Sequence, residues 1–395
     1  MLCDFYNKSQ QYQENLLSKY YKKQGHVVII IASTFESIFD YMEEKYNRSI
    51  KESECIVDGV KIIKLPYSIN LFNKLRKFNG VNKILEKEEP DIIFSHSIHL
   101  NLYEAVKYKK KNPKCKIIMD YHGDYSNSGK NWFSINILHK IIRKRILYSV
   151  LRYIDKIYTI VPAGYVFLNK LYSIPYSKMD LLPLGVDIDK SNEVRQQNKG
   201  KAIREKYGIT ADDFVIFTGG KLDLVKRTDI IIEAINILSD SRIHLFIVGA
   251  ISENNVPYKE RLEGLIKGNQ RIHFTGWLDG EEIYDYMNAS DIAIFPASQS
   301  VLWQQSIGMG LPLIIGTVVH VNEIIFEQDA DYLNVNNNVI VLDKDKVNSQ
   351  EIAKHIKRLI DDPDLLNMMK KGAIKTSEEF LSYDIIVKKT LEVVK

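Results

Sequence analysis

Two lysines just beyond a strand-like apolar run carry the clearest chemistry in this sequence. Residues 217–226 read Phe-Thr-Gly-Gly-Lys-Leu-Asp-Leu-Val-Lys, and a helical pattern follows directly. Two ammonium groups can neutralise most of the charge of a diphosphate, and the free amides at a helix start favour an anion for the same electrostatic reason. Gly219 and Gly220 let the backbone approach a ligand closely. The pattern predicts a diphosphate site at Lys221 and Lys226; the alternative is a surface loop that carries two lysines.

Length and composition are those of a globular protein with two domains. The chain has 395 residues, 45% hydrophobic and 26% charged, with a net charge of +4, and this length exceeds one ordinary core. Residues 101–160 hold 13 Lys and Arg against 4 Asp and Glu. Such a basic region can serve nucleic acid, anionic lipid or a phosphorylated substrate, or be only a solvated face. Nucleic acid is least favoured, because the basic residues lie beside aliphatic runs rather than among stacking aromatic residues.

The cysteine pattern and the lengths of the apolar runs indicate the cellular compartment of the protein. Cys3, Cys55 and Cys115 are scattered and show no metal-binding spacing, which suits a reducing cytoplasm. The first eight residues lack the basic and apolar regions of a signal peptide. No apolar run approaches the roughly 20 residues that span a bilayer. We therefore expect a cytoplasmic protein that contacts a membrane only peripherally.

Short, continuous apolar runs alternate with helical patterns in both halves, which indicates parallel sheets covered on both faces. The predicted strands are residues 27–32, 60–65, 91–94, 117–120, 157–160, 180–182, 214–218, 245–248, 272–274, 292–295, 313–315 and 339–342. A further, very short first strand is expected at residues 2–5, and helices at 12–24 and 102–111.

The resulting fold class is α/β, with two doubly wound Rossmann-like domains that leave a cleft at the carboxyl ends of their strands. We predict an N-terminal domain at residues 1–190 and a second domain at 206–375. The polar segment 189–205 is interpreted as a linker, and residues 376–395 as a helix that returns to the first domain.

The order and spacing of several short motifs carry a family resemblance. In the second half these motifs are Gly-Gly-Lys at 219–221 with Lys226, Leu-Phe-Ile-Val-Gly at 245–249, His-Phe-Thr-Gly-Trp at 273–277, Ala-Ser-Asp-Ile-Ala-Ile-Phe-Pro at 289–296 and Gly-Met-Gly-Leu-Pro-Leu-Ile at 308–314. Looser agreement in the first half comes from residues 25–28, 91–96, 121–123 and 182–187. The chain resembles the retaining GT-B glycosyltransferases of family 4.

The resemblance implies that Lys221 and Lys226 clasp the donor diphosphate and stabilise the charge that grows on the leaving group. Relatives carry two glutamates eight residues apart after the strand that ends near Pro296. Here Ala297 and Gln305 stand at that spacing. Glutamine can still bind one ribose hydroxyl, but without an ionic hydrogen bond; the alternative for Gln305 and its neighbour Gln304 is an exposed helix pair.

Other donor contacts are expected around the same helix start. Ser298, Gln299 and Ser300 are candidates to take over the contacts of the missing glutamate, and the amides of Ser300, Val301 and Leu302 are placed to meet phosphate. Trp277 can stack on the nucleotide base or merely cover the core.

In the first half, His122 follows a predicted strand, and the resemblance implies that a histidine here contacts the donor sugar. A structural histidine is the alternative. His96, at the end of the preceding strand, and Tyr12, which closes the polar stretch after the first strand, are the acceptor-side candidates.

Basic and aromatic residues alternate with aliphatic ones from Trp132 to Arg145. Such a helix can lie on an anionic membrane or simply pack on the sheet. If it lies on a membrane, a lipid-linked saccharide is the natural acceptor.

We therefore expect an enzyme that moves a sugar with retention from a nucleoside-diphosphate sugar, expected to be UDP-linked, to a saccharide or lipid-linked saccharide of a cell-surface polysaccharide. The resemblance implies no metal and no cofactor. A sugar-nucleotide epimerase and a catalytically silent subunit that binds a glycan or a partner transferase are the alternatives; the missing glutamates motivate the latter.

Overall fold

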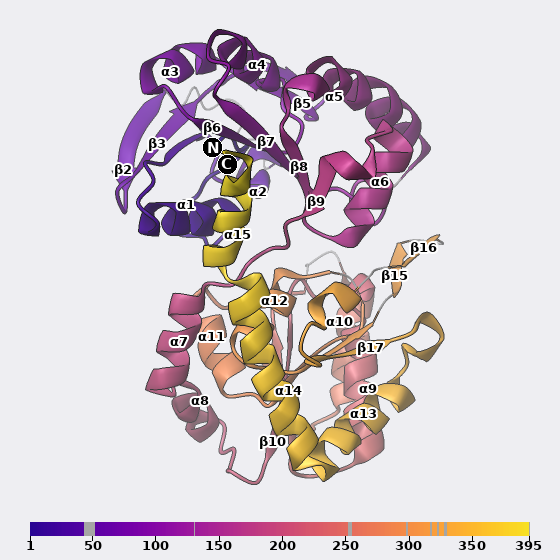
Figure 1. Cartoon of the computed structure of the whole chain (residues 1–395). Coiled ribbons are helices and arrows are strands. Elements are labelled where there is room, and N and C mark those ends of the chain that lie inside the picture. The colour runs from indigo at the N-terminus through magenta and orange to yellow at the C-terminus, as the bar shows by residue number, and fades with distance from the viewer. Residues whose placement is uncertain are drawn as a thin grey trace. The chain divides into compact units, whose positions relative to one another are not determined.

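The computed structural model describes residues 1–42, 52–129, 131–251, 255–297, 299–316, 318–321, 324–327 and 330–394. The chain divides into two compact α/β units, each with its own sheet and helices (Figure 1). Unit 1 comprises Met1–Pro183 and Tyr383–Lys395, and unit 2 comprises Leu184–Ser382.

Unit 1 is built on a mainly parallel sheet. Its strands are β1 (Ile29–Ser33), β2 (Ser53–Val57), β3 (Val60–Leu65), β6 (Ile92–His96), β7 (Lys116–Tyr121), β8 (Lys156–Thr159) and β9 (Met179–Leu181), with a separate hairpin of β4 (Tyr67–Leu71) and β5 (Leu75–Phe78). The sheet strands lie in the orders β1-β3-β2 and β6-β7-β8-β9. Within these two groups only β2 runs antiparallel to its neighbour. Leu2 bridges β1 and β6 in parallel and so joins the two groups.

Helices cover this sheet because each places an apolar stripe against it. They are α1 (Gln13–Lys23), α2 (Ile38–Met42), α3 (Val81–Glu88), α4 (Leu102–Lys111), the π-helix η2 (Ser134–Arg143), α5 (Lys144–Val150) and α6 (Pro162–Tyr172). From the C-terminus, α15 (Tyr383–Leu391) packs beside α1 (Figure 1), where the Tyr21 hydroxyl bonds to that of Thr390.

Unit 2 holds a six-stranded, all-parallel sheet of order β12-β11-β10-β13-β14-β17. The strands are β10 (Phe214–Gly219), β11 (Ile243–Val248), β12 (Ile272–Gly276), β13 (Ile292–Phe295), β14 (Leu313–Gly316) and β17 (Val339–Leu342), with a separate hairpin of β15 (Val318–Val321) and β16 (Ile324–Glu327). The helices are α7 (Ile188–Gln197), α8 (Gly200–Lys206), α9 (Thr228–Leu238), α10 (Val256–Ile266), α11 (Glu282–Asn288), α12 (Val301–Gly308), α13 (Ser349–Asp361) and α14 (Pro363–Thr376). Two apolar clusters, one on each face, bury the sheet.

Two expectations about the chain's organisation are wrong. The supposed linker at residues 189–205 is mostly helical, in α7 and α8, and belongs to unit 2. Ser191, Val194 and Gly200 are buried against the domain, and Arg204 donates to the carboxylate of Asp291. The first strand expected at residues 2–5 is shorter than predicted: only Leu2 forms parallel bridges, although the backbone from Met1 to Asp4 also hydrogen-bonds to β1.

The C-terminal ends of β10, β11 and β12 are held very close together. Gly220 donates its amide to the Val248 carbonyl oxygen at 2.9 Å, and Gly249 donates to the Gly276 carbonyl oxygen at 2.8 Å. At Gly249 φ is +140°, and a Cβ there would lie 1.9 Å from the carbonyl oxygen of Gly220. Only glycine fits this contact, so Gly249 fixes the backbone of the loop that begins at Gly220.

Substitution of Gly249 by alanine should therefore destabilise unit 2 and displace the loop. We expect the free energy of unfolding to fall by about 1–3 kcal/mol, as for other overpacked sites, in urea denaturation. Gly264 in α10 is the matched control, because a Cβ there meets no atom within 4 Å. Gly264→Ala should raise stability by roughly 0.5–1 kcal/mol. A Gly249→Ala protein as stable as the wild type would contradict the close contact.

Candidate functional site

The ammonium group of Lys226 lies at the start of helix α12. Its Nζ donates to the backbone oxygen of Gln299 at 2.7 Å, and Ser300 caps the helix by accepting from the Leu302 amide at 3.3 Å. A Cβ at Gly220 would lie 3.8 Å from both the Cε of Lys226 and the Oγ of Ser300. A glycine backbone, an ammonium group and a helix N-terminus thus meet beyond the central strand β10, which is an arrangement suited to an anion.

Burial lowers the pKa of Lys226 to about 8, and the nearby Asp223 carboxylate offsets only part of that effect. Asp223 is itself fixed, because its side chain accepts from the Val225 amide at 3.1 Å and caps the short 3-10 helix Leu224–Lys226. Desolvation therefore disfavours the charged lysine in the free protein. An anionic ligand beside Nζ would reverse this effect.

Lys221 and Trp277 are both open to solvent at the same edge of the sheet. In the described part of the chain, no hydrogen bond or ion pair involves the Lys221 ammonium group, whereas its neighbour Leu222 is buried and donates its amide to Ala250. Trp277 follows the last residue of edge strand β12 and is 73% exposed. That exposure excludes the alternative that Trp277 merely covers the core.

Gln304 and Gln305 are both buried, so the alternative of an exposed helix pair is wrong. Gln304 donates to the Tyr332 hydroxyl at 3.2 Å. Gln305 is 8% exposed and lies beside Tyr284, whose pKa is raised by burial and lowered again in part by the Gln305 side chain. The Gln305 amide therefore lies mostly within the core, beneath the helix start.

The remaining predicted donor contacts lie in the same region. Val301, the first residue of α12, is exposed, and Ser298 lies outside the described residues. A Cβ at Gly219 would come within 2.7 Å of the Val248 carbonyl oxygen, so the strand end also needs a residue without a side chain.

In unit 1, His96 and His122 converge on Asp120. Nδ1 of His96 lies 2.9 Å from Oδ2 of Asp120, and Nε2 of His122 lies 3.2 Å from the same oxygen. Burial would raise the pKa of Asp120, but the two imidazoles outweigh it and hold the pKa well below its ordinary value. Burial lowers the pKa of His122, yet the adjacent carboxylate raises it overall. The structure thus brings the donor-sugar candidate His122 together with the acceptor-side candidate His96, and it adds Asp120 to them.

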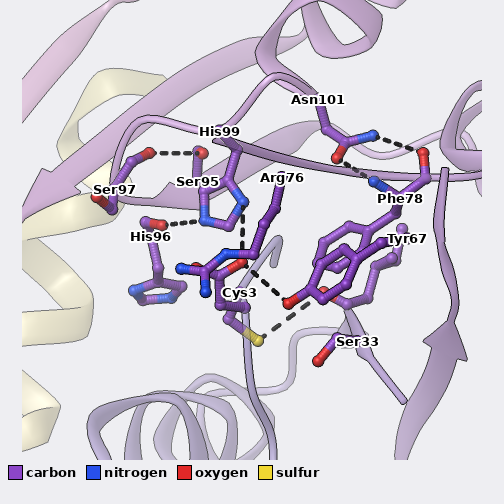
Figure 2. Close-up of polar contacts among 12 residues, drawn as sticks. Cys3, Ser33, Tyr67, Arg76, Phe78, Ser95, His96, Ser97, His99 and Asn101 are labelled. Carbon is purple, nitrogen blue, oxygen red and sulfur yellow. Dashed lines mark hydrogen bonds and ion pairs between the residues drawn. The ribbon is translucent and has the colours of Figure 1, made fainter. Parts of the chain in front are cut away.

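A second polar cluster lies at the same end of the unit 1 sheet. Figure 2 shows Arg76 among Tyr67, His96 and His99, and the guanidinium pairs with Asp4 at 2.6 Å. His99 bonds to the backbone oxygen of His96 and not to its ring (Figure 2). The remaining acceptor-side candidate, Tyr12, is exposed and precedes α1.

Asp120, Asp4 and Arg76 are the polar residues that sequence reasoning missed. Asp120 ends a predicted strand two residues before His122, so it lies on the same face of the chain; that spacing was the available signal. Asp4 and Arg76 are 72 positions apart, and no sequence pattern links them.

Comparisons with known proteins agree with this architecture. Residues 200–376 match the family model of glycosyl transferases group 1, and residues 15–190 match that of glycosyltransferase family 4. The glycosyltransferase of Rickettsia africae superposes with a TM-score of 0.68 at 19% identity, over 97% of this chain and 93% of that one. Anabaena Alr3699/HepE in complex with UDP gives a TM-score of 0.70 at 14% identity, over 100% and 98%.

A relative from Escherichia coli is the UDP-Gal:alpha-D-GlcNAc-diphosphoundecaprenol alpha-1,3-galactosyltransferase. It is 24% identical over 261 residues, which are 63% of this chain and 60% of that protein's length. The two sheets and their order define the GT-B class of α/β proteins. With both family models matched in sequence, the chain belongs to the family 4 glycosyltransferases.

Replacement of Lys226 by methionine should stabilise the free protein below pH 8. The pKa of this lysine falls from its ordinary 10.5 to about 8, so the unfolded chain binds more protons between these values and wild-type stability rises with pH there. Denaturation at pH 7 should show Lys226→Met more stable by on the order of 2 kcal/mol, with the difference shrinking towards pH 10.5. The exposed Lys221→Met is the control and should stay within about 0.5 kcal/mol of wild type. Equal stability of both variants at pH 7 would contradict the desolvation of Lys226.

Proposed function

We propose that the chain is a retaining glycosyltransferase that moves a sugar from a UDP-linked donor to a saccharide or lipid-linked saccharide in cell-surface polysaccharide synthesis. One observation carries the proposal: the desolvated Lys226 ammonium at the start of α12, next to Gly220. A nucleoside diphosphate would add negative charge beside an ammonium group whose burial Asp223 offsets only in part. Family membership supplies the type of reaction.

In this proposal the residues of unit 2 act on the leaving group. As the bond between the sugar and the diphosphate breaks, negative charge grows on the phosphate oxygens next to Lys226 and the α12 amides. The interaction is therefore stronger in the transition state than in the ground state. Lys221 adds a second charge from the open side, and Trp277 offers a ring for the base. These groups supply the positive field, so the transfer is proposed to require neither a metal nor a cofactor.

A lipid-linked acceptor is proposed from two observations. The relative from Escherichia coli acts, by its name, on a diphosphoundecaprenol-linked sugar. In unit 1, Trp132 is 70% exposed and Phe133 is 64% exposed. They precede helix η2, which carries Lys140 and Arg143, while Ile135 packs on the core. Exposed aromatic rings beside basic residues are suited to the headgroup region of an anionic membrane. Among the described residues, no helix is both long enough and apolar enough to cross a bilayer. We accordingly propose a cytoplasmic enzyme, peripheral on the inner face of the membrane.

A catalytically silent binding subunit is the second candidate. Ala297 and the buried Gln305 stand where relatives have glutamates, so neither position offers an ionic contact to a sugar or ribose. Such a protein would bind the nucleotide sugar without turning it over. Transfer assays with a panel of UDP-sugars and lipid-linked acceptors separate the two candidates.

Replacement of Lys226 by alanine should weaken UDP binding far more than uridine binding. Loss of a buried, charge-assisted contact corresponds to about 2–3 kcal/mol, or roughly 30- to 150-fold in affinity, measured by calorimetry. Trp277→Ala is the matched control: it should weaken UDP and uridine equally, because a stacking ring contacts only the base. Equal losses for UDP and uridine in Lys226→Ala would refute the assigned diphosphate contact.

Membrane association should depend on the aromatic pair. In liposome flotation, the wild type should float with vesicles that contain anionic lipid and less with neutral ones, because both charge and ring insertion contribute. The double variant Trp132→Ser/Phe133→Ser should lose most of the floating fraction. Tyr176→Ser, another exposed aromatic residue of unit 1, is the control and should float like the wild type. Flotation that is insensitive to both lipid charge and the double variant would argue against a membrane surface.

A further inference from the structure

Pairing between two neighbouring strands of unit 1 builds a compact set of metal-binding side chains. His96 ends β6 and lies opposite Asp120 in the parallel register of β6 and β7. His122 follows two residues after Asp120, on the same face of the chain. One ligand atom from each of the three side chains lies within 4.8 Å of those from the other two. The backbone of the sheet therefore holds the three groups together without help from a ligand.

The chemistry of this set is that of a transition-metal site. Two imidazoles and one carboxylate form a common protein ligand set for Zn²⁺. Nitrogen and oxygen ligands at about 2.0–2.1 Å from a tetrahedral ion stand roughly 3.3 Å apart. The observed separations of 2.9 Å and 3.2 Å from Oδ2 of Asp120 to the two ring nitrogens are close to that value.

Burial and charge favour a cation at the same place. Asp120 is fully buried and His96 is 5% exposed, and Nε2 of His96 and Oδ1 of Asp120 have no hydrogen-bond partner among the described residues. Glu14, in the first turn of α1, adds negative charge that acts on His122. The side chain of His122 is 39% exposed, which leaves a route for an ion and an open coordination position.

We propose that His96, Asp120 and His122 bind a divalent transition-metal ion of the Zn²⁺ type. The ion replaces the protons through which the two imidazoles contact the carboxylate. It takes no part in the transfer of the sugar and is therefore not a cofactor. The effect of the ion on the enzyme rests on the proposed function, together with the contact of His122 with the donor sugar that the family resemblance implies. An ion on His122 then competes with that contact, so micromolar Zn²⁺ inhibits the enzyme. The strand register thus supplies a metal-sensitive switch in unit 1, whereas the proposed diphosphate site belongs to unit 2.

Direct titration of the full chain with Zn²⁺, in competition with a chromophoric chelator and without nucleotide, tests the site. We expect the wild type to bind one ion at this site and His96→Gln and His122→Gln each to lose affinity by about tenfold or more. With Co²⁺ as probe, the visible absorption of a low-coordinate site should appear in the wild type and vanish in His122→Gln. His122 is partly exposed, so this variant should keep the wild-type circular dichroism and melting temperature.

The His244 and His273 pair of unit 2, with ring nitrogens 3.1 Å apart, is the competing place for an ion. His273→Gln is therefore the matched control and should bind Zn²⁺ like the wild type. Unchanged affinity in both His96→Gln and His122→Gln, or loss in His273→Gln alone, overturns the proposal, and so does a wild type that binds no Zn²⁺. Zn²⁺ binding that depends on His96 and His122, in a protein that transfers no sugar even after a chelator has removed the metal, would refute the proposed function and leave the metal site standing.

Discussion

Desolvation of one ammonium group is the constraint on which the proposed diphosphate site of this protein depends. Lys226 reaches the start of α12, where burial brings its pKa to about 8 and where its Nζ donates to the Gln299 carbonyl oxygen. An exposed lysine would gain little from a phosphate, because water already solvates it. A partly desolvated one has more to gain, since the ligand replaces solvation that the fold has removed. The cost to stability and the affinity for a diphosphate therefore have the same origin.

The glycines at the sheet edge make this geometry possible. Gly249 leaves room for the carbonyl oxygen of Gly220, and Gly220 leaves room between Lys226 and Ser300. A side chain at Gly249 would strike the carbonyl oxygen of Gly220, and at Gly220 the φ of +119° disfavours any residue other than glycine. The ligand site is thus defined as much by missing side chains as by charged ones.

Much of the fold could be predicted from the sequence, because buried parallel strands are continuous apolar runs. Strands β3, β13 and β17 and helix α4 begin and end where the runs do. Strand β2 and the β4–β5 hairpin were not predicted, because their outer faces are largely exposed and show no such run. Helices α7 and α8 were taken for a linker, because too few apolar residues mark their buried side.

The site could be predicted only where its parts are local in sequence. The Gly-Gly-Lys turn and Lys226 lie within one short segment, so they could be grouped directly. Gln299, at the start of α12, is 73 residues further along the chain, and only the family resemblance linked it to Lys226. Asp120 acquires one of its two partners, His96, through the register of β6 and β7, which one sequence cannot show. The burial of Gln305 also depends on the packing of α12 against neighbouring segments, not on its own residues.

Each unit holds a charged group near the C-terminal ends of its strands, a carboxylate in unit 1 and an ammonium group in unit 2. The two differ in how far neighbouring charges offset the cost of burial. In unit 1 the Asp120 carboxylate is matched by two imidazoles, so its charge is satisfied without any ligand, and its pKa is depressed. In unit 2 burial lowers the pKa of Lys226, and the Asp223 carboxylate offsets only part of this effect. For a lysine, a lowered pKa means that the surroundings disfavour the charged form. A fold tolerates such a charge where a ligand completes it. This difference in compensation supports the proposals of an anion site in unit 2 and of a preformed group in unit 1 whose protons a metal cation can replace.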